Sequence, residues 1–163
     1  MGIQAAYTQV DEPTLDRLVT LPPDELADAL EALETADAPT VYLDKLWDGL
    51  HFLLTGRSAS TPIDGDPLSE AVVGVHVFEG EDYVGCTEYD ELPGIIAALE
   101  AVDLRAVLAT TRFEAFAAAE VYPAIWTEDP ERLGAELAEA FGLLLGVHRA
   151  ARAARSHLVV SIL

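Results

Sequence analysis

Cysteine is nearly absent from this chain of 163 residues, because Cys86 is the only one. A single cysteine excludes a disulfide within the chain and a zinc site built from cysteines alone, and it is typical of a reducing compartment. No apolar run reaches the roughly 18 residues that a membrane-spanning helix needs, and the first residues lack the pattern of a secretory signal. We therefore expect a soluble, cytoplasmic protein that does not enter a membrane.

Basic residues are also scarce: 9 Lys and Arg stand against 29 Asp and Glu, so the formal net charge is −20. Such a field repels phosphate backbones and anionic headgroups, which argues against nucleic-acid binding and in favour of a cationic protein partner. All acids lie within residues 1–140. The basic group near the C-terminus predicts either an anion-binding patch or a simple complement to a helix C-terminus; it comprises His148, Arg149, Arg152 and Arg155.

Hydrophobic residues make up 51% of the chain and charged residues 23%, which is enough apolar material for a core. Neither an internal repeat nor a linker interrupts the sequence, so we expect one domain over residues 1–163. Residues 3–10 and 157–163 favour strands, and residues 131–155 favour one long helix. The sequence therefore predicts the α+β class, with several helices, a long C-terminal helix and a small mixed sheet that contains both terminal strands.

The intervening elements follow from apolar spacing and from turn residues. We expect helices over 14–20, 22–33, 67–73, 91–101 and 104–119, the last broken near Thr110-Thr111, and strands over 40–43, 76–78 and 83–86. Asp44 is a plausible N-cap for a central helix that ends at Gly56. Glycines inside the long C-terminal helix weaken it, which suggests that another element packs closely against that face; they are Gly134, Gly142 and Gly146.

No phosphate loop, dinucleotide fingerprint, nucleophile elbow or paired cysteine cluster is present. The remaining candidate pocket is a polar set on and after the central helix: Asp44, Trp47, Asp48, His51, Thr55, Arg57 and Ser58, with Ser60 and Asp64 beyond them. On a helix Asp48 can orient His51 while a loop serine approaches it, which is the arrangement of a nucleophile and its base. The competing interpretation is that Trp47 and His51 fill the core.

A metal site is not expected from spacing, because no two of the four histidines lie three or four residues apart. A histidine would have to meet carboxylates through the tertiary structure. The sequence therefore predicts no metal and no cofactor.

The segment from Asp44 to Gly56, DKLWDGLHFLLTG, resembles the hallmark helix of the YfbM-like family, a bacterial domain of unknown function. Three further stretches are similar to the family pattern: the Met1-Gly2 start, residues 66–74, and Tyr122-Pro123 before the long helix. The resemblance implies a compact α+β domain in the bacterial cytoplasm. It implies no reaction, cofactor or catalytic residue.

Two functional hypotheses remain at this point, beside a third possibility that the charge only suits a salty or crowded cytoplasm. The first is a binding or interaction protein without catalytic activity, which sequesters a basic protein partner, because an acidic field speeds association with cations. The second is a small hydrolase or ligand-binding enzyme that uses a pocket around His51. The sequence leaves the oligomeric state open.

Overall fold

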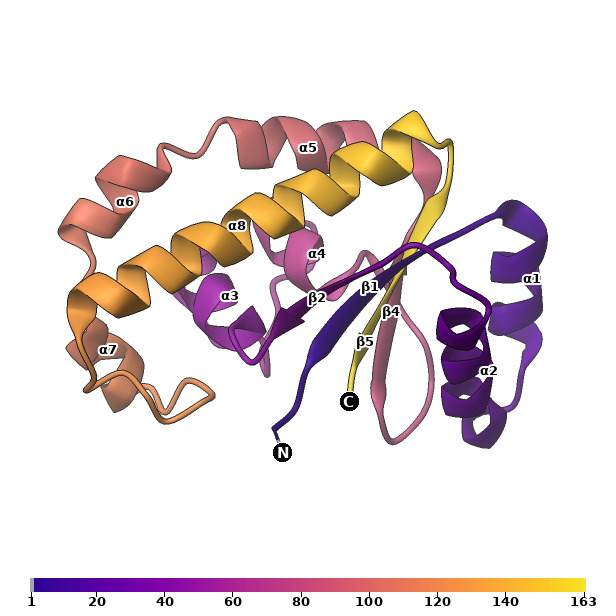
Figure 1. Cartoon of the computed structure of the whole chain (residues 1–163), viewed down its shortest axis with the longest axis horizontal. Coiled ribbons are helices and arrows are strands. Elements are labelled where there is room, and N and C mark those ends of the chain that lie inside the picture. The colour runs from indigo at the N-terminus through magenta and orange to yellow at the C-terminus, as the bar shows by residue number, and fades with distance from the viewer. Residues whose placement is uncertain (1) are drawn as a thin grey trace.

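The computed structural model describes residues 2–163, which form a five-stranded sheet with helices on both faces (Figure 1). The strands are β1 (Ala5–Val10), β2 (Thr40–Asp44), β3 (His76–Val77), β4 (Tyr83–Thr87) and β5 (His157–Ile162). The helices are α1 (Glu12–Thr20), α2 (Pro23–Thr35), α3 (Trp47–Thr55), α4 (Pro67–Val73), α5 (Leu92–Glu100), α6 (Leu104–Thr110), α7 (Phe113–Ala118) and α8 (Pro130–Ala153). The expected α+β class, long C-terminal helix and terminal strands are confirmed.

The strand order is β2-β1-β5-β4-β3, so the two terminal strands lie side by side at the centre. β1 and β5 pair from Ala5 with Ile162 to Val10 with His157. All the pairings in this sheet are antiparallel, where a mixed sheet was expected. The short turn between β3 and β4 allows only an antiparallel pair, but the direction of β5 against β1 depends on the path of 146 intervening residues. Apolar periodicity carries no information on that path.

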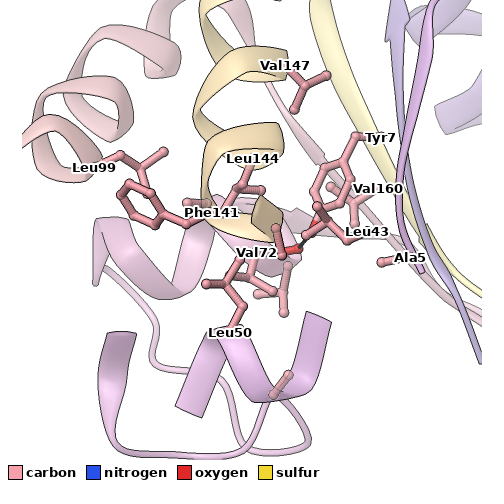
Figure 2. Packing of buried hydrophobic residues seen from close by; sticks show 14 of the residues in the cluster. Ala5, Tyr7, Leu43, Leu50, Val72, Leu99, Phe141, Leu144, Val147 and Val160 are labelled. Carbon is pink, nitrogen blue, oxygen red and sulfur yellow. Dashed lines mark hydrogen bonds between the residues drawn. The ribbon is translucent and has the colours of Figure 1, made fainter. Parts of the chain in front are cut away.

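The larger core lies between the sheet and α8, with α3, α4 and α5 beside it (Figure 1). Leu144 and Val147 of α8 meet Tyr7 and Val160 of the central strands, as Figure 2 shows. The Tyr7 ring is fully buried, and its hydroxyl donates a hydrogen bond of 2.6 Å to the backbone oxygen of Val72 in α4. The phenol is therefore satisfied inside the core, and burial raises the pKa of Tyr7 far above its usual range.

The smaller core lies on the opposite face of the sheet, under α1 and α2 (Figure 1). It contains Leu15, Leu18, Leu26 and Leu30 of these two helices, packed on Val10, Val84, Cys86 and Val159 of the strands. Because side chains alternate along a strand, Leu158 and Val160 face the larger core while Val159 faces the smaller one. Apolar residues therefore occupy both faces of β5.

The central helix begins later than the sequence predicts. Asp44 ends β2 with a positive φ of 51°, and α3 begins only at Trp47, so Asp44 is not its N-cap. The predicted end is correct, because Gly56 closes the helix at φ 76°, a conformation that glycine adopts without steric cost. Strand β2 continues to Asp44 because that residue pairs with Ala5 of β1. This pairing depends on a distant segment and is invisible to local spacing.

The glycines of α8 do not mark a close approach. A Cβ built on Gly134, Gly142 or Gly146 meets no atom within 4 Å outside the local helix backbone. The expectation of an element packed tightly against that face is therefore wrong, because α8 buries Leu133, Leu137, Phe141 and Leu144 rather than the glycine positions. Within residues 2–163 the structure contains no helix long and apolar enough to cross a membrane.

Candidate functional site

His51 is completely buried, and both of its ring nitrogens have hydrogen-bond partners. Nδ1 lies 2.7 Å from the backbone oxygen of Arg57, and Nε2 lies 2.7 Å from the hydroxyl oxygen of Ser69 in α4. A carbonyl only accepts, so Nδ1 carries the proton and Nε2 accepts from the Ser69 hydroxyl. Burial lowers the pKa of His51, although the Arg57 carbonyl partly opposes that shift. The imidazole is a neutral internal bridge.

Ser69 is equally inaccessible and has a second structural contact. Its hydroxyl oxygen accepts a hydrogen bond of 2.9 Å from the backbone N–H of Ile63. The buried His51 and Ser69 therefore tie α3, α4 and the loop between them together. A substrate has no path to either group in this arrangement, because both are 0% exposed.

Asp48 does not orient His51, contrary to the arrangement that a hydrolase would need. Its carboxylate accepts hydrogen bonds from the backbone N–H groups of Ala59 (2.7 Å) and Tyr122 (2.9 Å). The Ser58 hydroxyl donates to the same carboxylate over 2.9 Å. With 4% of its surface exposed, Asp48 is a buried anchor for two loops. Asp48 and His51 do have helical spacing, but the Asp48 carboxylate accepts hydrogen bonds from these backbone N–H groups and from Ser58 instead of from the His51 ring.

The other residues of the predicted pocket hold the chain in place or lie at the surface. Thr55 donates from its hydroxyl to the His51 backbone oxygen over 2.7 Å, while the side chain of Arg57 is exposed. Ser60 and Asp64 are exposed on the same loop, and Asp44 lies apart at the end of β2. The predicted set is therefore divided between the buried Asp48 and His51 and the exposed Asp44 and Arg57.

Trp47 anchors the N-terminal segment. Its indole N–H donates to the Ile3 backbone oxygen over 3.0 Å, and its ring stacks on Tyr122 with centroids 5.7 Å apart. The Tyr122 hydroxyl in turn accepts from the Ile3 backbone N–H over 2.8 Å. Of the predicted Met1-Gly2 start, Met1 lies outside the described residues.

His148 is buried and is not part of the predicted anion patch at the surface. His148 is 1% exposed, its Nδ1 lies 2.7 Å from the Leu144 backbone oxygen, and burial lowers its pKa to about 4. Arg149, Arg152 and Arg155 are exposed at the end of α8, and Arg149 lies 3.3 Å from the Glu100 carboxylate. The separation follows from the helical period, since His148 belongs to the buried face. Anion binding by the three arginines stays a prediction.

A groove lies on the other side of the molecule, between the α1–α2 pair and the β3–β4 hairpin. Its first part has a volume of about 420 Å³ and combines apolar residues with acids at its edge. Leu15, Leu21, Leu26 and Phe78 contribute apolar surface, and the wall also includes Val77, which is 62% exposed. Val19, which also lines this part, is 57% exposed, so two exposed valines adjoin the apolar surface.

A second hollow of about 500 Å³ shares Pro23, Leu26 and Glu79 with the first, so the two adjoin. We refer to both together as the acidic groove. Six carboxylates line it: Asp16, Asp24, Glu79, Glu81, Asp82 and Glu88. Among the described lining residues no Lys or Arg balances them. The groove is therefore an anionic surface with an apolar floor, suited to a cationic ligand.

Cys86 lies at the floor of the acidic groove but is not prepared for nucleophilic chemistry. The residue is 4% exposed, and burial raises the pKa of its thiol to about 11, helped by the nearby Glu88 and Glu91 carboxylates. A thiol reacts as the thiolate, which these surroundings disfavour. Cys86 is therefore not expected to act as a nucleophile.

Sequence reasoning missed the acidic groove as a site. The turn Glu79-Gly80-Glu81-Asp82 was visible as an acidic hairpin connection, but the acids of α1 and α2 reach it only through the tertiary packing. Apart from that turn, the summed charge was the only sequence signal, and it gives no location.

The structure defines an acidic α+β domain with a central antiparallel sheet and a groove lined by carboxylates. The chain belongs to the family described as "Domain of unknown function (DUF1877)", whose model matches residues 1–161. It is 34% identical over 131 residues to Protein YfbM of Escherichia coli (strain K12), covering 77% of this chain and 75% of that protein. A solved structure titled as a protein of unknown function, YfbM from Escherichia coli, matches with a TM-score of 0.84 and 28% identity, over 98% of this chain and 99% of that one. The resemblance to the YfbM-like family is thereby confirmed.

Proposed function

We propose that this chain is a cytoplasmic, non-catalytic binding protein that captures a cationic segment of a partner protein in the acidic groove. The observation that carries the proposal is the six carboxylates around an apolar floor, without a lining Lys or Arg among the described residues. A segment that alternates Lys or Arg with apolar side chains complements both the charge and the floor. The lone buried thiol of Cys86 suits a reducing compartment.

The long-range field supports the same function. With a net charge of −20, the chain attracts a cationic partner before contact and speeds its association. Once the partner is in contact, the apolar floor supplies the part of the affinity that salt does not screen. The same field opposes nucleic acids and anionic lipids, so a basic protein segment is the occupant that we favour.

The experiment titrates a fluorescent amphipathic peptide of Arg and Leu into the protein and follows anisotropy at low salt. A peptide of Glu and Leu of equal length tests the requirement for positive charge. The groove variant E79Q/E81Q/D82N removes three carboxylates from the β3–β4 turn. The matched control, E31Q/E114Q/E139Q, removes three exposed carboxylates from α2, α7 and α8 that do not line the groove.

Three exposed ion pairs at roughly 0.5 kcal/mol each amount to about 1.5 kcal/mol, so the groove variant should bind the Arg/Leu peptide roughly tenfold more weakly. The control should lose much less, because its carboxylates act only through the screened distant field. Equal losses in the two variants would show that the net charge, and not the groove, attracts the peptide. That result would overturn the proposed site.

A further inference from the structure

We infer that His76, Glu88 and Glu91 form a binding site for a divalent transition-metal ion, with Zn²⁺ as the best match. His76 comes from β3, while Glu88 is the N-cap and Glu91 the last residue of the short 3₁₀ helix at Tyr89–Glu91 that follows β4. One ligand atom from each lies within 4.8 Å of the other two. This inference does not depend on the proposed binding of a protein partner.

Strand pairing brings the histidine to the carboxylates. His76 pairs with Cys86 across β3 and β4, so the side chains of these two residues lie on the same face of the sheet. Glu88 follows Cys86 by two residues, and Glu91 lies one turn further on. The sequence separation of His76 and Glu91 is 15 residues, which hides the set from any local motif search.

The two carboxylates are held before any ion arrives. The Glu88 side chain accepts from the backbone N–H of Glu91, and the Glu91 side chain accepts from the backbone N–H of Glu88 over 2.8 Å. This reciprocal capping box holds both side chains on the same side of the turn. Each carboxylate oxygen has more than one lone pair, so a metal ion can share the group with its backbone donor.

The distances suit one small ion. Nε2 of His76 lies 3.0 and 3.1 Å from the two oxygens of Glu91, and 3.7 Å from Oε2 of Glu88. Zinc–nitrogen and zinc–oxygen bonds of about 2.0–2.2 Å at tetrahedral angles separate ligand atoms by roughly 3.4 Å. The His76 side chain is 52% exposed and free to open by the few tenths of an ångström required. Zn²⁺ would take the place of the proton between His76 and Glu91.

The donor set discriminates between metals. One imidazole nitrogen and two carboxylates suit Zn²⁺, whereas Mg²⁺ and Ca²⁺ prefer ligand sets made only of oxygen. Glu70 lies near the site: burial raises the pKa of the Glu70 carboxyl, and the Glu91 carboxylate raises it further. This additional negative charge strengthens the attraction for a cation. His76 is also unique among the described histidines in being exposed, since the other three are buried.

The test titrates Zn²⁺ alone into the full chain by isothermal calorimetry, with Mg²⁺ and Ca²⁺ as comparators. We expect one saturable Zn²⁺ site per chain and much weaker binding of the other two ions. The variants H76A and E91Q should each bind Zn²⁺ at least roughly tenfold more weakly, since even residues that only support a metal ligand change affinity by about 10–100-fold. E114Q is the matched control, because Glu114 is an exposed acid of α7 outside both the set and the acidic groove.

A second measurement reports directly on the ligand. In wild-type protein the imidazole NMR signals of His76 should shift on addition of Zn²⁺, while those of the buried His148 should stay in place. Circular dichroism of H76A and E91Q verifies that the variants are folded. Absence of saturable Zn²⁺ binding, unchanged affinity in H76A and E91Q, or an equal loss in E114Q would each overturn the proposal.

Discussion

Asp48 provides the sharpest test of the structure, because one buried carboxylate holds two loops. The substitution D48N keeps the shape of the side chain but replaces one acceptor oxygen with an NH₂ donor. The backbone N–H groups of Ala59 and Tyr122 bond to different oxygens of Asp48, so one of them must face that new donor. The variant therefore loses a hydrogen bond to a charged group and leaves a buried N–H without an acceptor.

Each of these two effects costs on the order of 1.5–3 kcal/mol, so we expect D48N to lower the free energy of unfolding by about 3 kcal/mol or more. For a chain of this length that corresponds to a fall in Tm of roughly 6–12 °C. The assay is urea denaturation followed by far-ultraviolet circular dichroism, with thermal melts as a second measure.

The matched control is D44N, the same chemical change at an exposed residue. Asp44 has a φ of 51°, a left-handed conformation that asparagine tolerates well, so D44N should stay within about 0.5 kcal/mol of wild type. If D48N is as stable as D44N, the carboxylate does not hold the two loops. The account of Asp48 as a structural anchor would then be wrong.

The remaining predictions concern packing and pH. In urea denaturation G49A should lower the free energy of unfolding by about 1–3 kcal/mol, because its Cβ would lie 2.3 Å from the Trp126 ring. G142A has open space around its Cβ and should raise the free energy of unfolding by roughly 0.5–1 kcal/mol. Equal effects of the two variants would refute this packing. Burial lowers the pKa of His148 from 6.5 to about 4, so the unfolded chain binds more protons between these values. The contribution of His148 to the free energy of unfolding is therefore fully present above about pH 6.5. It is lost as pH falls towards about 4, a change on the order of 3 kcal/mol. In H148M the urea midpoint should change less with pH in this range. A smaller dependence should remain, because burial also lowers the pKa of His51. An unchanged dependence on pH would show that His148 is not neutral inside the fold.

Local patterns account for most of the elements. Pro67 after Asp66 predicts the start of α4, and the structure confirms it, since the Asp66 carboxylate accepts from Leu68 N–H over 2.9 Å. The end of α3 at Gly56 and the β-branched strand that closes the chain also follow from residue type and spacing. These features depend on interactions within a few residues, which is why sequence alone can predict them.

The candidate pocket was harder to predict, because helical spacing says which side chains share a face and not which partners they meet. Asp48 and His51 do lie on one helix, but Asp48 bonds to backbone groups of two loops and His51 bonds to Ser69, eighteen residues away. A long-range partner that offers a better donor replaces the local one. Which partners Asp48 and His51 bond to therefore depends on where the loops lie in the folded chain.

The sequence by itself determined the family, the α+β class, the acidity and the positions of nearly all helices and strands, because composition and periodicity are local properties. Only the tertiary structure decided the strand directions, the burial of His51 and His148, the acidic groove and the meeting of His76 with Glu88 and Glu91. The physical reason is that each of these features joins segments far apart in the chain. Their proximity is set by the packing of α1 and α2 on one face of the sheet, and of α8 on the other.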